Sequence, residues 1–308
     1  MGEESGYANN LSANTVNGKI YAIGGNSMNL VSLKISEEYD PLKDTWSKRA
    51  DMPTARLAFS TSVIDGKIYA IGGGNWPGIN CFSIVEVYDP IADTWSKASD
   101  MPTARRGLST SAVNGKIYAI GGDNKFGPCL STVEEYDPIA DKWAKKADMP
   151  TARFGLCTCV VNGEIYAIGG IPVNVQAWKA LSALEVYNPV TDKWSKKADM
   201  PTARTNFATC VVDGKIYAIG GSTFQPSVVT SRVEVYDPAT DRWTEKADMA
   251  IARGWLSASE VNGKIYAIGG STDVDYLSTV EEYTPEGWSS VISSNGKLPS
   301  VWGKLKAK

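Results

Sequence analysis

Glutamate and arginine recur along this chain at a spacing that could place charged side chains in a ring. A Glu-x-Tyr pattern occurs six times, at Glu37, Glu86, Glu134, Glu185, Glu234 and Glu281. An arginine closes a Pro-Thr-Ala-Arg or Ile-Ala-Arg segment five times, at Arg56, Arg105, Arg153, Arg204 and Arg253. Grouped carboxylates could act as general acid and base. Catalysis needs an asymmetric site, however, so the sixfold repetition favours a structural hydrogen-bonding role for the glutamates. For the arginines two interpretations stay open: a structural role, or a ring of cations at the mouth of a site, broken where Ala8 stands in the sixth position.

The chain contains no histidine. This removes imidazole acid–base chemistry, Ser-His-Asp and Cys-His triads, and imidazole metal sites. We therefore expect no catalytic triad, no metal and no cofactor.

Five cysteines are too few and too scattered for a disulfide framework. Cys157 and Cys159 lie two residues apart on one expected strand, so they point to the same side, and Cys210 takes the place of Cys159 one repeat later. The equivalent residues elsewhere are Ser62, Ser111, Ser259 and Asn14. Cysteine as a substitute for serine is the simpler interpretation, and a soft-metal site is the alternative. A bridge between Cys81 and Cys129, in neighbouring loops, also stays open.

These residues belong to a unit that occurs six times. Each copy carries Lys-Ile-Tyr-Ala-Ile-Gly-Gly or a close variant, and the first glycines of successive doublets lie 48, 49, 48, 51 and 49 residues apart. A tryptophan follows the Glu-x-Tyr tyrosine after seven residues in five copies, and after five residues in the sixth, at Trp288. Such a period is the signature of a repeat architecture.

Each copy is expected to form four short strands. In the third copy, Leu108 to Val113 ends at Asn114-Gly115, a pair typical of a type I′ hairpin turn. The return strand is Lys116 to Ile120, the third strand is Thr132 to Tyr136, and the fourth is Trp143 to Lys146. One such meander cannot bury both faces, so it must stack on further copies. Four-stranded sheets of this period close radially into a propeller.

A unit of about 50 residues with a glycine doublet and spaced tyrosine and tryptophan resembles the kelch repeat. The resemblance implies an all-β, six-bladed propeller in which each blade is a four-stranded antiparallel meander. The expected blades span residues 8–50, 54–99, 103–147, 151–198, 202–247 and 251–292, followed by a tail at 293–308. Many kelch propellers exchange a strand between termini. No exchange is evident here, so the sequence predicts that blades one and six meet through side-chain packing alone, and that the tail is a packed strap or a disordered end.

Residues that differ between equivalent places of the copies are free of the demands of the shared blade. They lie in the loops after the glycine doublets and in the two residues after each repeat arginine, including Arg106, Phe154, Asn206 and Trp255. Both sets should converge on one rim around the axis, which by resemblance is the face that kelch domains use for binding. The predicted ligand-binding residues are Trp255, Trp76, Trp178, Arg106, Phe154, Asn206, Phe126, Phe224, Tyr276 and the five repeat arginines, Arg56, Arg105, Arg153, Arg204 and Arg253.

The favoured function is a binding scaffold for a protein segment, a glycan or a small organic ligand at this rim. By resemblance, kelch propellers also include a sialic acid mutarotase, copper galactose oxidases and iron-dependent specifier proteins, the last two with histidine ligands. A metal-free enzyme, such as an isomerase or biosynthetic enzyme with its active site in the same central pocket, is the alternative. Its candidate residues are Arg106, Asp123, Asp273, Asp275 and Tyr276. A purely structural repeat protein is the third hypothesis.

Composition excludes two kinds of partner. The formal charge is −3 without a basic run, which argues against nucleic acid. No stretch of eighteen apolar residues and no leader pattern is present, so the sequence predicts no membrane span and no secretory signal. We expect a monomer made of one propeller without an adaptor domain, and a cytoplasmic location fits best.

Overall fold

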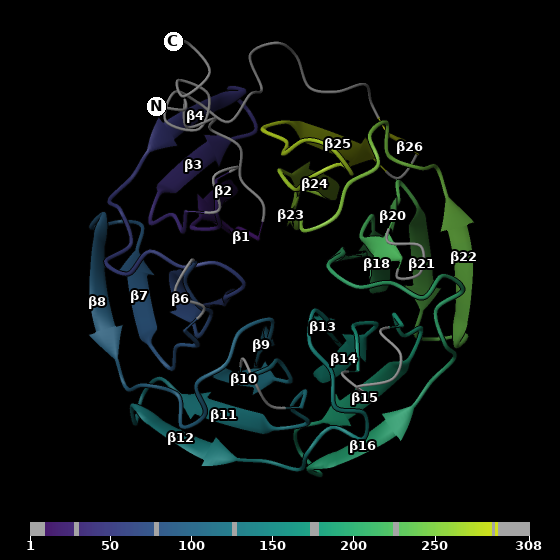
Figure 1. Cartoon of the computed structure of the whole chain (residues 1–308), viewed down its shortest axis with the longest axis horizontal. Coiled ribbons are helices and arrows are strands. Elements are labelled where there is room, and N and C mark those ends of the chain that lie inside the picture. The colour runs from purple at the N-terminus through teal and green to yellow at the C-terminus, as the bar shows by residue number, and fades with distance from the viewer. Residues whose placement is uncertain are drawn as a thin grey trace.

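The structure, a computed structural model, describes residues 10–27, 31–76, 80–124, 128–172, 179–223, 228–284 and 287–288. In these ranges the chain forms six four-stranded antiparallel sheets arranged as blades around a central axis (Figure 1). This confirms the predicted six-bladed all-β propeller. The described residues include no helix long and apolar enough to span a bilayer.

Every blade runs from the axis outwards in chain order. The innermost strands are β1 (Ser12–Val16), β5 (Ser60–Ile64), β9 (Ser109–Val113), β13 (Cys157–Val161), β17 (Ala208–Val212) and β23 (Ser257–Val261). The second strands are β2 (Lys19–Ile23), β6 (Lys67–Ile71), β10 (Lys116–Ile120), β14 (Glu164–Ile168), β18 (Lys215–Ile219) and β24 (Lys264–Ile268). The third strands are β3 (Ser36–Asp40), β7 (Val85–Asp89), β11 (Val133–Asp137), β15 (Leu184–Asn188), β21 (Val233–Asp237) and β25 (Val280–Thr284). The outermost strands are β4 (Thr45–Lys48), β8 (Thr94–Ala98), β12 (Lys142–Lys145), β16 (Lys193–Lys196), β22 (Arg242–Lys246) and β26 (Gly287–Trp288). Blade five carries an extra pair, β19 (Ser222–Thr223) and β20 (Val228–Val229).

Local sequence explains the hairpins. Asn114 and Gly115 both have positive φ, 52° and 70°, as a type I′ turn requires. The glycine doublet after each second strand also has positive φ, at 65° and 98° for Gly121 and Gly122. A Cβ on Gly121 would lie 2.6 Å from the Arg153 carbonyl oxygen, so only glycine allows the next link to approach this closely.

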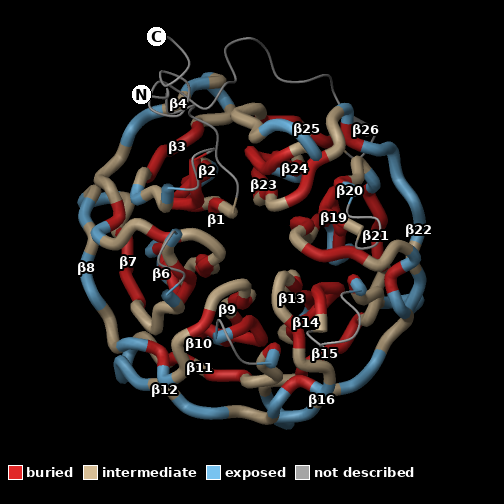
Figure 2. Tube along the Cα trace, in the orientation of Figure 1, coloured by how far each residue is buried: buried red, intermediate tan, exposed pale blue. Residues whose placement is uncertain are grey.

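The blades hold together through packing between neighbouring sheets. The second and third strands are buried and the outermost strands are largely exposed (Figure 2). The repeat tyrosine and tryptophan stack within a blade, as in Tyr88 and Trp95, whose ring centroids lie 5.1 Å apart. The Trp95 Nε1 then donates to the Ala50 carbonyl of the segment that enters the blade, at 2.9 Å. These aromatic residues therefore pack within each blade and join it to the segment that enters it.

The ring closes between the two ends of the described chain without exchange of a strand. Blade one consists of β1 to β4 and blade six of β23 to β26. The prediction that these blades meet through side-chain packing alone is wrong. The Asn10 N–H donates to the Trp255 carbonyl at 3.1 Å, and the Thr15 hydroxyl donates to the Glu260 carbonyl at 2.7 Å. The residues that precede the two first strands approach closely enough at the axis for their backbone groups to bond.

Candidate functional site

The two variable sets of residues meet on one face of the propeller. In blades two to six, the residue after each repeat arginine forms a β-bridge with the residue after the glycine doublet, as in Arg106 with Asp123 and Phe154 with Ile171. Each link into a first strand therefore lies against the loop between strands two and three of its own blade. The predicted convergence of the two sets agrees with this geometry.

Six residues, one from each blade, surround the axis on this face and share a left-handed backbone. They are Asn10, Ala58, Gly107, Gly155, Asn206 and Trp255, with φ between 51° and 62°. Their backbone groups bond from blade to blade: Trp255 N–H donates to the Asn206 carbonyl at 2.7 Å, and Asn206 N–H donates to the Gly155 carbonyl at 3.1 Å. Glycine and asparagine suit such a backbone, whereas a bulky aromatic residue does not. Trp255 is the outlier of this ring.

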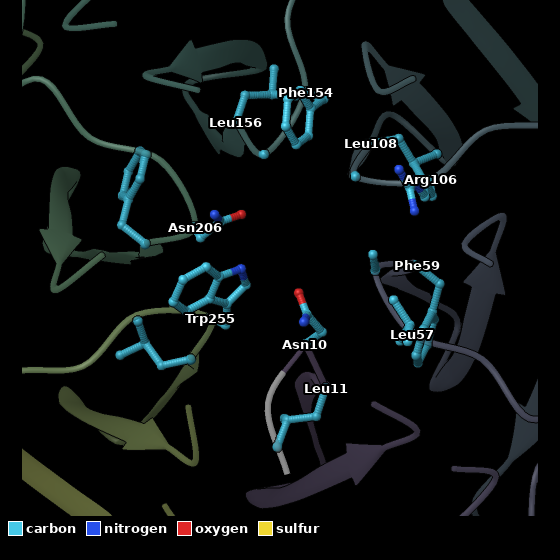
Figure 3. Close-up of a pocket in the computed structure, with 15 residues that line it drawn as sticks. Asn10, Leu11, Leu57, Phe59, Arg106, Leu108, Phe154, Leu156, Asn206 and Trp255 are labelled. Carbon is cyan, nitrogen blue, oxygen red and sulfur yellow. The ribbon is translucent and has the colours of Figure 1, made fainter. Parts of the chain in front are cut away.

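A cavity of about 320 Å³ opens on the axis inside this ring. Figure 3 shows the Trp255 indole and the amides of Asn10 and Asn206 pointing toward its middle, with Arg106 across from Trp255. The Phe154 ring lines the same cavity. The site thus combines two aromatic walls, two amides and one cation. Four predicted site residues, Trp255, Arg106, Phe154 and Asn206, come together here.

Apolar residues form the floor of the cavity, and sequence reasoning missed them. The third residue after each repeat arginine is always leucine or phenylalanine, and blade one has Leu11 in that place. The set is Leu11, Phe59, Leu108, Leu156, Phe207 and Leu256. Five of these also line a second, deeper cavity of about 250 Å³ that is otherwise bounded mostly by hydroxyl-bearing residues of the first strands. The apolar residue found at this place in all six copies was the sequence signal that could have revealed this floor. Asn10 belongs to the same variable set as Trp255, in the matching place of blade one, but it was not among the predicted ligand-binding residues.

Arg106 is held at the edge of the cavity by an acid from the adjacent loop. Its Nε donates to the Asp123 Oδ1 at 3.0 Å, and 30% of the Arg106 side chain is exposed. Its terminal guanidinium nitrogens have no bond to the described residues. A half-exposed arginine fixed in this way can present its free edge to an anionic or acceptor group.

The five repeat arginines do not form a cationic mouth, so their inclusion among the ligand-binding residues is corrected. Arg56, Arg105, Arg153, Arg204 and Arg253 are all fully buried. Each pairs with the repeat glutamate of its own blade, with N–O distances of 2.5 to 3.0 Å in blades two to five. Arg105 also donates to the carbonyls of Gly121, Thr132 and Ala119. Burial lowers the pKa of Arg105 to about 10, so the side chain stays charged at neutral pH. The structural interpretation of both charged rings is confirmed.

Blade one departs from this pattern. Glu37 is 1% exposed, and within the part of the chain that the structure describes its Oε2 has no hydrogen-bond partner. Burial raises the pKa of Glu37 to about 8, with the Lys48 charge acting in the opposite direction. The cause is visible in the sequence, because Ala8 stands where the other blades have arginine.

The remaining predicted residues lie away from the cavity or cannot be placed. Trp76 is 40% exposed on a neighbouring loop, and its backbone N–H donates to the Ser32 hydroxyl. The Tyr276 hydroxyl accepts a bond from the Asn26 amide, and neither Tyr276 nor the acids Asp273 and Asp275 line the cavity. Trp178, Phe126 and Phe224 lie outside the described residues.

None of the five cysteines, all of which lie in the described ranges, forms a disulfide. Cys81 and Cys129 do not bridge, since each Sγ donates to a carbonyl of the next blade, that of Asp123 and that of Ile171. Across the described ranges, no three acidic or thiol side chains are grouped so that they could hold a metal ion.

Burial raises the pKa of the Cys159 and Cys210 thiols well above the ordinary value. Because the thiolate is the nucleophile, both should resist alkylation in the folded protein up to about pH 9 and react only on unfolding. Iodoacetamide labelling followed by peptide mass spectrometry, with and without denaturant, measures this. Rapid native labelling of either residue would contradict it.

The fold and this axial cavity define a repeat propeller with one asymmetric site on a symmetric frame. The KLHDC2/KLHL20/DRC7 Kelch-repeats domain matches residues 99–270, and the Kelch motif matches residues 8–53, 55–102 and 256–290. The chain belongs to the kelch-repeat family.

Curated relatives share only short segments with this chain. Human "Kelch repeat and BTB domain-containing protein 12" is 41% identical over 76 residues, 22% of this chain and 11% of that protein. "Kelch-like ECH-associated protein 1B" of Danio rerio is 40% identical over 48 residues, 16% of this chain and 8% of that protein. Among solved structures, that of YjhT has a TM-score of 0.78 and 18% identity, covering 94% of this chain and 99% of that one. This last likeness concerns the fold alone.

Proposed function

We propose that the propeller is a binding scaffold that captures a small organic group in the axial cavity. The group is either a free ligand or a side chain of a bound protein segment. The left-handed backbone of Trp255 is the observation that carries the proposal. A bulky residue in this conformation is strained by about 1–3 kcal/mol, and such strain tends to persist at functional sites. Nothing in the repeat requires tryptophan there, because the equivalent places hold asparagine, alanine and glycine.

The lining of the cavity narrows the chemistry of the ligand. The indole of Trp255 and the ring of Phe154 offer flat apolar surfaces, and the guanidinium of Arg106 offers donors to an anion or carbonyl. The amides of Asn10 and Asn206 add donors and acceptors. A volume of about 320 Å³ lies at the small end of ligand pockets. The best fit is a compact group with one flat face and one carboxylate, carbonyl or phosphate.

The test compares Trp255→Gly with the wild type in a fluorescence and calorimetric screen of glycans, peptides and small metabolites. Glycine adopts a positive φ without strain, so we expect Trp255→Gly to stay within about 1 kcal/mol of the wild-type stability. It should nevertheless lose at least about 30-fold in affinity for any ligand that the wild type binds, as expected for a central tryptophan.

Two variants serve as controls. Asn206→Gly changes another left-handed position of the same ring and should reduce affinity only modestly, because it removes one hydrogen-bonding group. Trp76→Ala removes an exposed tryptophan away from the cavity and should leave affinity unchanged. If Trp255→Gly retains wild-type affinity for a confirmed ligand, or if Trp76→Ala alone abolishes binding, the site does not lie in the axial cavity.

A further inference from the structure

A groove between blades four and five opens on the face of the propeller opposite the axial cavity. Its volume is about 500 Å³. The hairpin turns that follow the first strands line it, and because those strands begin beside the axial cavity, their far ends mark the opposite face. The two blades are neighbours around the axis (Figure 1). The charged and aromatic residues of the groove are Glu164, Tyr166 and Lys197 from blade four and Asp213, Lys215 and Asp237 from blade five.

Blade one shows what the equivalent side chains do when a carboxylate faces them. Tyr21, in the place of Tyr166, donates its hydroxyl at 2.8 Å to Glu38, which faces it on the third strand. Arg49, in the place of Lys197, reaches the same Glu38 carboxylate with an Nη2–Oε2 distance of 2.6 Å. Blade three repeats this arrangement with Tyr118, Glu135 and Lys146. In each of these blades, one tyrosine hydroxyl and one cation therefore hold one carboxylate.

Blade four keeps the two donors, but its third strand supplies no carboxylate. Val186 faces Tyr166 there. In the described part of the chain, the Tyr166 hydroxyl and the half-buried Lys197 ammonium make no hydrogen bond or ion pair. Asp241 of blade five feels the Lys197 charge, but its Oδ1 already accepts two other hydrogen bonds. Burial raises the pKa of Tyr166 to about 12, so its hydroxyl keeps its proton at neutral pH and can donate.

Glu164 adds an acid to this groove. The second strand begins with lysine in the other five copies, and in four of them this lysine pairs with the aspartate that ends the third strand. Blade four has Glu164 and Asn188 at these two places, and the Asn188 amide donates to Glu164 Oε1 at 3.1 Å. Glu164 makes no ion pair with the described residues, and it lies on the same side of its strand as Tyr166. Blade five also has valine opposite its tyrosine, but it keeps the lysine, Lys215.

We propose that this groove binds a small zwitterion of the amino-acid type, with one carboxylate and one ammonium group. Tyr166 and Lys197 hold its carboxylate in the way that Tyr21 and Arg49 hold the carboxylate of blade one. Glu164 accepts from its ammonium group. This site is separate from the axial cavity and does not depend on the function proposed for it.

The charges of the groove favour a zwitterion over a simple anion or cation. Lys215 and Asp237 neutralise each other, with 3.6 Å between Nζ and Oδ2. Glu164 and Asp213 would repel a simple anion, and Lys197 would repel a simple cation. A ligand that carries both charges meets a counterpart for each, through the stronger, charge-assisted kind of hydrogen bond.

Titration of the full chain with leucine, N-acetyl-leucine and leucinamide, followed by backbone amide NMR, tests the proposal. Leucine should bind and shift the amide signals of blades four and five. N-acetyl-leucine lacks the ammonium group and leucinamide lacks the carboxylate. Each should therefore bind at least about tenfold more weakly, as expected for the loss of a hydrogen bond between charged groups.

Variants of the groove assign the contacts. Lys197→Ala and Glu164→Gln should each lower the affinity for leucine at least about tenfold. Lys196→Ala is the matched control, because this exposed lysine is adjacent in the chain but lies on the other side of the strand. It should leave the affinity unchanged, as should Trp255→Gly in the axial cavity. Val186→Glu should block the site with a carboxylate of the chain itself, and Lys197→Ala tests the same contact if that variant does not fold.

Three results would overturn the proposal. The first is no binding of leucine at concentrations up to about 10 mM. The second is equal affinity for leucine and for either blocked form, which would mean that the groove does not recognise both charges. The third is binding of leucine that Trp255→Gly abolishes and Lys197→Ala leaves intact, which would assign it to the axial cavity.

Discussion

Glu134→Gln is expected to destabilise the folded propeller by about 3–5 kcal/mol, because it leaves the Arg105 charge buried without a counterion. Arg105 is fully buried and its NH2 lies 2.8 Å from Glu134 Oε2. Glutamine keeps the shape of glutamate and an acceptor oxygen, so the loss reports the charge rather than a cavity. Urea unfolding at pH 7, followed by tryptophan fluorescence and circular dichroism, measures it.

The control is Arg106→Gln, one residue along the chain. Arg106 also forms an ion pair, with Asp123, but its side chain is 30% exposed. Because the Arg106 side chain is partly solvated, although Asp123 is buried, the pair should contribute less than the fully buried one, about 1 kcal/mol, so this variant should unfold much more like the wild type than Glu134→Gln does. Equal losses for Glu134→Gln and Arg106→Gln would mean that the buried pairs do not hold the blades together.

The contrast between Arg105 and Arg106 shows why the sequence alone could not tell which charged side chains are exposed and which are buried. Arg105 and Arg106 are identical in type and adjacent in the chain, and the burial of one depends on the link folding back over the first glycine of the preceding blade, Gly72. The repetition of the Glu and Arg positions was the usable signal, and it indicated a structural role for the glutamates, whereas the arginines were wrongly counted among the ligand-binding residues. That Ala8 replaces the repeat arginine was visible in the sequence as well, but the burial of Glu37 was not.

The fold was predictable from the sequence because the features that determine its strands and turns are local in the chain. Asn-Gly and Asp-Gly turns, β-prone runs and glycine doublets repeat six times, and the second strand of blade three has the predicted bounds, Lys116–Ile120. The other strand bounds differ by about one residue, as for β11, Val133–Asp137, against a predicted start at Thr132. Only the closure between blades one and six, which depends on how the ends meet in space, was mispredicted.

The axial cavity was predictable in part. Comparison of the six copies found Trp255, Arg106, Phe154 and Asn206, because their places differ between blades. It could not separate them from Trp76 and Tyr276, since rim loops vary whether or not they face the axis. It also discarded the leucine and phenylalanine floor, because a residue type common to all copies looks like scaffold even where it lines a site.

The change in stability caused by Glu37→Gln should have the opposite sign to the change caused by Glu134→Gln at the equivalent position. We expect it to stabilise the protein by about 3 kcal/mol at pH 7, from the pKa difference between the folded state and an ordinary glutamate. Burial raises the folded pKa of Glu37 to about 8 from 4.5. The folded state thus holds this proton more tightly than the unfolded chain does, so the stability that it contributes is complete below about pH 4.5 and is lost as the pH rises through about 8.

Unfolding free energies measured from pH 5 to pH 9 test this in one series. The wild type should lose stability across the range, and Glu37→Gln should remove most of that slope, because no other repeat glutamate is without an arginine among the described blades. Lys48 and Asp51 are the charges that act on Glu37, in opposite directions, so neither should mask the effect. A destabilising Glu37→Gln would mean that Glu37 is ionised and paired, and that an unrecognised cation, from the terminal segments or from a partner, occupies the place of the sixth arginine. The sign of this one substitution therefore decides whether the ring is closed by five buried ion pairs or by six.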